Sequence, residues 1–543
     1  MRIAVAVTGQ ALPWAARLRS GLPGHDVAIT DVTAATAVHE GRMGRRDRSR
    51  CLDAYEELVR SLVPAAGPAP VAEPGRAARG PVTRAAEAAA ERFRSALYAL
   101  ADAAAAAGGL GPVLRPEAAV AVVESVGDQD GPGGRDLQDA YHAAELLAAC
   151  LRPLADAGRV LGGELASVDL WHSVGGGRTV LPGLLAHRAY GIPLVVTEFE
   201  SALRGAADAA AGLRRGARRL PLALLRMLAR EAYRSAGVIT AGSAFTRRWL
   251  EHCGAEPGRL RVLPEGLPSV ERPAAGPEPA TPTLAWQGSL LPGCGLETLL
   301  HAFAAVRAAL PEALLRVHAL RRDERYVADC LALARRLGLL TESRPAGGPE
   351  PVALLAGEVG PADAGGSVLV LPEYDRPAPH ELAAAMATGR AVVATDVGMS
   401  RELLGPTGLL VPPGDPDALA AACVALLRDP ERRSRLGLAG RLRAQERCAE
   451  QAAVEAFGDI YLELISRAPG FPGAGRAPGG PRPFAHPVEF WLSGEHQAHT
   501  ERQEHGERQE HGEGEPGGRA GAPHAELVPG GSGSSGGLGG AEE

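Results

Sequence analysis

Short apolar runs alternate with amphipathic stretches along most of the chain, and many of the runs end at a turn that contains Gly, Pro or Thr. This alternation predicts strand–helix units, and therefore a doubly wound α/β fold built on parallel sheets. The expected strands of the first half lie at residues 1–7, 25–30, 168–174, 193–200 and 237–241. Those of the second half lie at residues 283–288, 314–319, 368–371 and 389–398.

The number of strand–helix units predicts two domains. A chain of 543 residues is too long for one ordinary hydrophobic core. We expect a first Rossmann-like domain over residues 1–270, with a helical insertion at about 40–110, and a second over residues 284–456. The stretch between them, 271–283, is rich in Pro and Ala and is typical of a linker.

The end of the chain has a different composition. A last helix is expected at residues 457–467, and the segment 468–543 is rich in Gly, Pro and Ser, with a tandem ERQEHG repeat at 501–512. Such a segment buries too little apolar surface to fold, so we expect it to be disordered.

Composition excludes several classes of function. The chain contains no lysine, so all 57 basic residues are Arg, which excludes a Walker P-loop and a Schiff-base lysine. A net charge of −7 does not favour nucleic acid as a partner. The seven scattered cysteines form no metal-ligand spacing, so neither a metal cofactor nor a disulfide framework is expected. We see no signal peptide and no apolar run long enough to span a membrane, and therefore predict a cytoplasmic protein.

Candidate chemistry gathers after the strand at 368–371. Glu373 follows the strand end, and Glu381 lies in the first turn of a helix expected to begin near Pro379, with seven residues between the two carboxylates. In a parallel α/β sheet, ligands bind at the carboxyl ends of strands, where the free N–H groups of a helix start attract phosphate. Carboxylates accept hydrogen bonds from sugar hydroxyls, so this pair is suited to a nucleotide-sugar.

The residues that follow strengthen this prediction. The run Gly389–Gly398, the segment Arg401–Leu404 and the stretch 408–419 resemble, in order and spacing, the second half of the family 4 retaining glycosyltransferases. That resemblance implies a GT-B fold, in which two Rossmann-like domains face a cleft. It also implies transfer of a sugar, of the hexosyl type, from a nucleotide-sugar to a glycan, lipid-linked or small-molecule acceptor. Glu373 would then contact the sugar as a catalytic residue, and Glu381 would bind the ribose.

The first domain resembles one subgroup of that family, the enzymes of Pel exopolysaccharide synthesis. The subgroup's first-domain strand ends in a His, which His172 matches, and its next strand ends in Thr-Glu-His-Gly, where this chain has Thr197, Glu198, Phe199 and Glu200. The resemblance implies a catalytic His172, an acceptor side formed by Gly9, Glu198 and Phe199, and a role in polysaccharide biosynthesis.

Three positions depart from the family pattern. Phe199 replaces the subgroup's His, while Ser289 and Cys294 stand where the family has the Arg and Lys that hold the donor diphosphate, in the loop that begins at Gly288. A charge-assisted hydrogen bond contributes about 1.5–3 kcal/mol, so losing two removes roughly 3–6 kcal/mol. Arg321 or Arg322, at the end of the neighbouring strand, or Arg376, in the loop before Glu381, is expected to substitute for these cations, and Pro377 of the same loop is also assigned to the donor site.

Two functions therefore stay open at the level of sequence. One is a working glycosyltransferase. The other is a degenerate relative that binds nucleotide or glycan, or supports an active partner in polysaccharide synthesis.

A basic stretch from Arg204 to Arg234 supplies a further hypothesis. It carries eight arginines against Asp208 and Glu231. Such a segment can dock on anionic lipid at the inner membrane face, or hold an anionic lipid-linked acceptor. A solvated helix face is the alternative.

Overall fold

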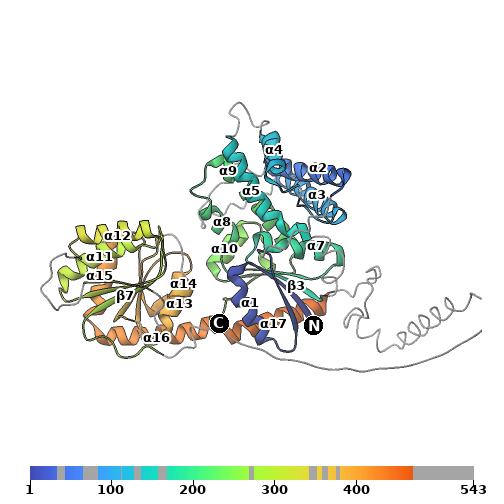
Figure 1. Cartoon of the computed structure of the whole chain (residues 1–543). Coiled ribbons are helices and arrows are strands. Elements are labelled where there is room, and N and C mark those ends of the chain that lie inside the picture. Colours follow the sequence, from blue (N-terminus) through green and yellow to red (C-terminus); the bar gives the residue numbers. More distant parts are fainter. Residues whose placement is uncertain are drawn as a thin grey trace, which may run out of the picture. The chain divides into compact units, whose positions relative to one another are not determined.

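The structure is a computed structural model. It describes residues 1–33, 43–64, 84–111, 113–127, 136–156, 168–267, 274–340, 351–356, 365–374 and 379–468. These residues contain two six-stranded sheets, in which all paired strands are parallel (Figure 1). The α/β class and the two doubly wound, Rossmann-like sheets predicted for a GT-B protein are confirmed. The predicted disorder of 469–543 lies outside the described residues.

The first sheet has the strand order β2-β1-β3-β4-β5-β6. Its strands are β1 Arg2–Val7, β2 Asp26–Asp31, β3 Leu170–Val174, β4 Leu194–Glu198, β5 Val238–Ala241 and β6 Leu260–Val262. Every residue of β3, β4 and β5 is buried, as expected for central parallel strands that helices cover on both faces.

Helices of two origins pack around this sheet. Those that follow its strands are α1 Leu12–Gly21, α7 Val180–Tyr190, α8 Ala202–Ala209, α9 Arg215–Ser235 and α10 Ala244–His252. The insertion between β2 and β3 consists of α2 Arg45–Leu62, α3 Arg84–Ala107, α4 Pro116–Gly127 and α5 Leu137–Leu151. It therefore extends well beyond the predicted end at about 110, because the alanine-rich stretches up to residue 151 are also helical. Figure 1 shows these helices beside α9, whose buried side chains share one core cluster with theirs.

The second sheet has the order β12-β11-β10-β7-β8-β9. Its strands are β7 Thr283–Leu290, β8 Leu314–Arg322, β9 Val352–Ala356, β10 Val368–Leu371, β11 Ala391–Thr395 and β12 Leu409–Val411. Its helices are α11 Leu296–Ala309, α12 Glu324–Arg336, α13 Pro379–Ala387, α14 Ser400–Leu404, α15 Pro416–Leu427 and α16 Pro430–Cys448. Two apolar clusters cover it, one beneath α11, α12 and α15, the other beneath α13, α14 and α16.

The last helix, α17 Glu450–Arg467, packs on the first sheet rather than the second. Its buried residues Val454, Phe457, Ile460 and Tyr461 join the cluster that contains Ile3 and Val5 of β1. Figure 1 shows α17 beside α1 and the N-terminal strand. The helix begins earlier than predicted, because the break from α16 falls at Ala449, which has an extended backbone.

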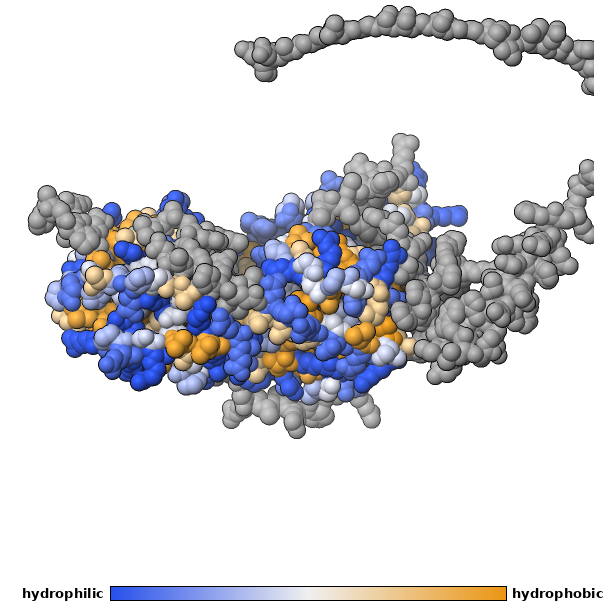
Figure 2. Space-filling model, turned by 90° about the horizontal axis from the view of Figure 1, so that it is seen from below, coloured by the Kyte–Doolittle hydropathy of each residue, from blue (hydrophilic) through white to orange (hydrophobic). Residues whose placement is uncertain are grey.

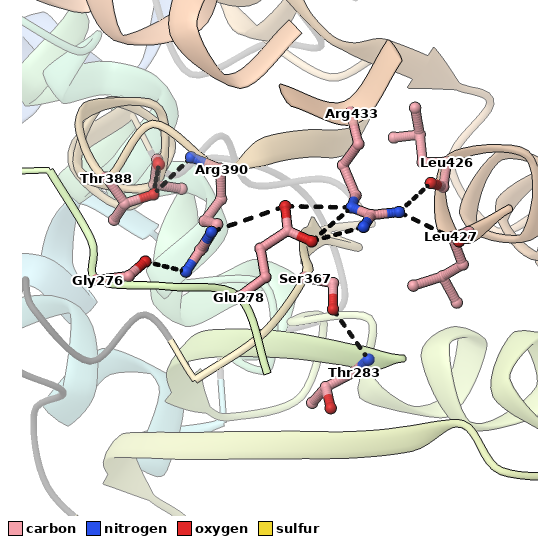
Figure 3. Close-up of polar contacts among 10 residues, drawn as sticks. Gly276, Glu278, Thr283, Ser367, Thr388, Arg390, Leu426, Leu427 and Arg433 are labelled. Atoms are coloured by element: carbon pink, nitrogen blue, oxygen red, sulfur yellow. Dashed lines mark hydrogen bonds and ion pairs between the residues drawn. The ribbon is translucent and has the colours of Figure 1, made fainter. Parts of the chain in front are cut away.

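The linker is tied to the second domain by ion pairs (Figure 3). The carboxylate of Glu278 accepts hydrogen bonds from Arg433 at 2.5–3.2 Å and lies 3.7 Å from Arg390. Arg433 also donates to the carbonyls of Leu426 and Leu427 at the end of α15. The linker residues from 274 onward are therefore fixed in place.

Within the described ranges, no helix is both long and apolar enough to cross a bilayer. The face seen in Figure 2 carries small hydrophobic groups separated by hydrophilic residues. Leu438 and Leu442, one turn apart on α16, are among the exposed large apolar side chains.

Candidate functional site

The carboxyl edge of the second sheet holds Glu373 in a tightly packed loop. The hydroxyl of Thr395, at the end of β11, donates to the carbonyl oxygen of Glu373 at 2.6 Å. From the other side, the β7–α11 loop packs against the chain, and Tyr374 donates its N–H to the carbonyl of Gly293. Gly295 has a φ of +80°, and a Cβ there would lie 1.8 Å from the carbonyl oxygen of Pro372. Only glycine allows this approach.

This packing controls the charge of Glu373. Its side chain is buried, and burial raises its pKa to about 8, with a further contribution from the negative charge of Glu381. Its own backbone N–H and the indole of Trp286 oppose that rise only in part. The structure thus brings the two predicted carboxylates together, with Glu381 in the first turn of α13. At neutral pH Glu373 carries a proton, so it can both donate and accept a hydrogen bond.

His380, which the sequence analysis did not single out, adds an imidazole to this edge. It is the second residue of α13, and its Nε2 lies 2.9 Å from a carboxylate oxygen of Glu265. The bond to Glu265 raises the pKa of His380, and the charges of Glu381 and Glu200 act in the same direction. The ring lies at a helix start, where an anionic group is favoured. In the sequence, the position of His380 next to Glu381 could have indicated that it belongs to this site.

The positions that replace the family's cations hold neutral side chains. Cys294 lies beside Tyr326, with its Sγ 3.3 Å from the phenolic oxygen, and that phenol donates to Glu297. Burial raises the pKa of Cys294, so its thiol stays protonated. Ser289 pairs in register with Arg321 on β8, after a shift at Gly288.

Two predicted donor residues, Arg376 and Pro377, lie outside the described residues. The structure therefore adds nothing to their predicted role. The side chain of Arg321 also lies outside what the structure describes, so its role in the donor site stays a prediction.

In the first domain, His172 is a fully buried residue of β3. Its Nδ1 lies 2.6 Å from the hydroxyl of Tyr461 on α17, and its Nε2 lies 2.6 Å from the hydroxyl of Thr197 on β4. Thr197 in turn lies 2.5 Å from the hydroxyl of Thr240 on β5. Burial lowers the pKa of His172 to about 3, so the ring is neutral. Both ring nitrogens are used within the protein, and the catalytic role predicted for His172 stays a prediction.

Glu198 is also buried. One oxygen accepts from the N–H of Ala202 at the start of α8, and the other accepts from the hydroxyl of Tyr233 at 2.5 Å. Burial raises the pKa of this carboxyl. Gly176, at a φ of +63°, is needed here, because a Cβ would lie 2.6 Å from a Glu198 oxygen.

Phe199 occupies the position of the subgroup's histidine and is part of an apolar contact. Its ring lies 5.3 Å from that of Trp14, and its carbonyl accepts from the hydroxyl of Thr246. Gly9 opens a short 3₁₀ turn after β1. The three residues assigned to the acceptor side thus lie at or just beyond the carboxyl ends of β1 and β4, at one edge of the first sheet.

A pocket that the sequence analysis missed lies at this same edge. It has a volume of about 450 Å³, and in the first domain it is lined by Gln10, Glu200, Ser201, Arg204, Gly205, Asp208, Ala209, Ser243, Phe245, Thr246 and Trp249. The lining comes mainly from the length of α8 and from the first half of α10, which follow β4 and β5. Because these segments are remote in sequence from one another, only the sheet order brings them together.

The basic stretch is partly neutralised in the structure. Arg214 pairs with Asp136 at 2.6 Å, and Arg234 pairs with the buried Glu231 at 2.6 Å. The apolar side of α9, including Leu220 and Leu224, is buried in the core. The stretch therefore does not present α9's apolar face to a lipid surface, and the predicted membrane contact stays a prediction.

At the two sheet edges, the described residues form no metal ligand set. Across the ranges that the structure describes, no group of three or more His, Cys, Asp or Glu side chains is placed to hold a metal ion. The expectation that no metal is required stays a prediction.

Comparison with known families bears on the second domain. Residues 281–429 match the family described as Glycosyl transferases group 1. This range contains β7 to α15, including Glu373 and Glu381, so this part of the chain is similar to glycosyl transferases of group 1. Residues 73–258 match a second family, described only as a domain of unknown function, DUF3492. No curated protein matches the chain.

Several solved structures match the chain at low identity. HepE from Anabaena in complex with UDP is 17% identical, with a TM-score of 0.46, over 58% of this chain and 84% of that chain. Sucrose-phosphate synthase from Thermosynechococcus elongatus is 21% identical, with a TM-score of 0.47, over 62% and 82%. A glycosyltransferase from Rickettsia africae is 11% identical, with a TM-score of 0.48, over 86% and 99%. Values this low assign no activity to the chain.

Proposed function

We propose that this protein is a glycosyltransferase that moves a sugar from a nucleotide-sugar donor to an acceptor hydroxyl, with retention at the anomeric carbon. The observation that carries the proposal is the buried Glu373 beside Glu381 at the start of α13. Both residues fall in the range that matches Glycosyl transferases group 1.

The proposed roles follow from charge and position. Glu381 accepts hydrogen bonds from the ribose hydroxyls, and the protonated Glu373 binds the hydroxyls of the donor sugar. The N–H groups that open α13, together with His380, face the diphosphate, because the N–H groups carry partial positive charge and the pKa of His380 is raised.

The proposed reaction step is balanced within the substrates. The bond between the anomeric carbon and the diphosphate oxygen breaks, and a bond to the acceptor oxygen forms on the same face of the sugar. The proton of the acceptor hydroxyl passes to the leaving diphosphate, so the step requires no metal and no redox partner.

The finer assignments rest on sequence resemblance. Membership of family 4, similarity to the Pel subgroup and hexosyl transfer into a polysaccharide are part of the proposal. A cytoplasmic location and peripheral contact with the inner membrane face are also part of the proposal. The acceptor is a glycan, a lipid-linked sugar or a small molecule.

A second candidate function is supported by the β7–α11 loop. Cys294, at the family's Lys position, lies against Tyr326 and is uncharged. With Ser289 at the Arg position, neither side chain carries a charge to neutralise the leaving diphosphate. A protein with this loop would bind the donor and turn it over slowly or not at all, acting as a sensor or as a supporting subunit.

The test is a calorimetric titration of the full chain with UDP, GDP, ADP and their common sugar conjugates, followed by an assay for release of free nucleotide. Glu381→Ala should weaken binding of the preferred nucleotide by roughly 10- to 100-fold, since a hydrogen bond to a charged group contributes about 1.5–3 kcal/mol. Glu312→Ala, which removes an exposed carboxylate before β8, is the matched control.

Each outcome separates the candidates. Binding with release of nucleotide supports the enzyme, and binding without release supports the degenerate protein. Unchanged affinity in Glu381→Ala would show that the nucleotide binds elsewhere.

A further inference from the structure

One face of α16 carries two large apolar side chains that remain exposed. Leu438 and Leu442 are 61% and 59% exposed, and they lie one turn apart on the helix. In Figure 1, α16 lies along the lower side of the second domain, and Figure 2 looks at the molecule from that side. Exposed apolar side chains that are grouped indicate a contact surface, whereas single ones are common on any protein.

The helix that presents these leucines is fixed firmly to the second domain. Gly437 packs on the turn before β11, where a Cβ would lie 2.0 Å from the carbonyl oxygen of Gly389. Arg433, one turn earlier, is bonded to the linker carboxylate of Glu278. The outer face of α16 is therefore preformed, so a partner that binds it has little chain to order.

Charged side chains lie on either side of the leucines, with opposite signs at the two ends. Arg435 precedes Leu438 by three residues, and Glu446 follows Leu442 by four. Both charged side chains are exposed, and at 3.6 residues per turn all four share one face of the helix. Arg435 forms no ion pair with any residue that the structure describes.

The order Arg, Leu, Leu, Glu is complementary to itself when it is reversed. The two leucines are centred on residue 440, and Arg435 and Glu446 are centred between residues 440 and 441. If a second α16 runs antiparallel across the first at this point, Leu438 faces Leu442 of the partner subunit, and Arg435 faces Glu446 of the partner subunit. A twofold axis then repeats both contacts on its other side.

The charges favour a second copy over the other partners that exposed leucines could bind. An anionic membrane would meet the carboxylates of Glu431 and Glu446, which are exposed on the same face as the leucines. An acidic or a basic protein surface would match one end of this face and repel the other. A reversed copy of the same helix matches both ends.

We infer that two copies of this protein associate through α16, packed antiparallel about a twofold axis with Leu438 and Leu442 at the centre. This contact is independent of the proposed glycosyl transfer. It uses one helix from each copy, so it belongs to the small interfaces, which bury less than about 1,200 Å² and are transient. Association should therefore depend on the protein concentration.

The experiment measures sedimentation velocity of the full chain, without nucleotide, over a wide range of concentrations. The sedimentation coefficient should rise with concentration from that of a monomer towards that of a dimer. Leu438→Glu puts a carboxylate at the centre of the contact and should raise the dissociation constant of the dimer by roughly tenfold or more. Leu137→Glu is the matched control, because Leu137 is 63% exposed on α5 of the first domain, and it should leave the dissociation constant unchanged.

Two charge reversals test the antiparallel arrangement. Arg435→Glu and Glu446→Arg should each weaken self-association by roughly three- to tenfold, because each puts two like-charge pairs into the contact. An equal mixture of the two variants, with one of them fluorescently labelled, should associate as tightly as the unmodified protein. In that mixture, each charge at position 435 meets the opposite charge at position 446 of the other variant.

Three results would overturn the inference. The unmodified protein could stay monomeric at every concentration, or Leu438→Glu could leave a dimer unchanged, which would place the contact elsewhere. The mixture of charge variants could also associate no more tightly than either variant alone, which would exclude the antiparallel pairing. An unchanged midpoint of thermal unfolding in each variant shows that lost association is not lost folding. Titration with nucleotide-sugars tests the proposed function separately, and either result can hold without the other.

Discussion

Replacing Glu373 by Gln should stabilise the second domain, and the gain should depend on pH. A carboxyl in the unfolded chain titrates near pH 4.5, whereas burial raises the pKa of Glu373 to about 8 in the folded protein. Between these values the unfolded side chain is ionised and the folded one is protonated, so folding must take up a proton. The stability that the protonated group allows is complete below pH 4.5 and is lost as the pH rises towards 8.

The size of the effect follows from the two pKa values. At pH 7 the proton must be taken up about 2.5 pH units above the unfolded pKa, and each pH unit costs about 1.36 kcal/mol. The cost is therefore roughly 3 kcal/mol at pH 7, and it approaches about 5 kcal/mol above pH 8. Glutamine keeps the shape and cannot ionise, so Glu373→Gln should regain this free energy.

The assay is urea unfolding of the full chain at several values between about pH 5 and pH 8, read by hydrogen–deuterium exchange of peptides from β7 and β10. This readout follows the second domain by itself. The difference in unfolding free energy between Glu373→Gln and the unmodified protein should grow by about 1.4 kcal/mol per pH unit. Glu312→Gln, at an exposed carboxyl of the same domain, should show no such slope. A constant difference across this range would refute a buried, protonated Glu373.

Two further predictions concern buried polar contacts. Tyr461→Phe should lower the unfolding free energy of the first domain by about 1–3 kcal/mol, because it leaves the buried Nδ1 of His172 without its partner. Hydrogen–deuterium exchange of β3 peptides in urea measures this loss of stability. An unchanged stability would mean that the His172 ring finds another partner. Glu278→Gln should lower the unfolding free energy of the second domain by about 3–5 kcal/mol, because Arg433, whose side chain is 10% exposed, would keep an unpaired charge. A loss under about 1 kcal/mol in thermal unfolding would show that the carbonyls at the end of α15 satisfy Arg433 alone.

Local pattern was sufficient to predict the two sheets. The alternation of apolar runs with amphipathic stretches placed most of the strands, because a parallel sheet buries both faces of each strand. β9 Val352–Ala356 was missed, since a short apolar run after a Gly- and Pro-rich stretch has no periodicity to distinguish it. The insertion was predicted too short, because alanine-rich helices carry a weak contrast between their faces.

The site was predictable only where its parts are close in sequence. Glu373 and Glu381 meet because a short loop joins a strand end to a helix start, which the spacing already indicated. The burial of Glu373 depends instead on Gly295 meeting Pro372 across the sheet edge. The contact between His172 and Tyr461 spans 289 residues, and Arg204 meets Trp249 only because β4 and β5 are neighbours. Such contacts need the strand order, which local pattern does not contain.

The return of α17 to the first sheet has a consequence for how the protein is made. Phe457 and Tyr461 complete the cluster that covers β1, so the first domain lacks part of its core until nearly all the described chain has left the ribosome. The second domain contains its sheet and its two apolar clusters within residues 267–448, and can fold beforehand. The order of folding during translation would then reverse the order of the domains in the chain. A nascent chain stopped before α17 would leave Ile3 and Val5 partly uncovered, and would be a target for chaperones.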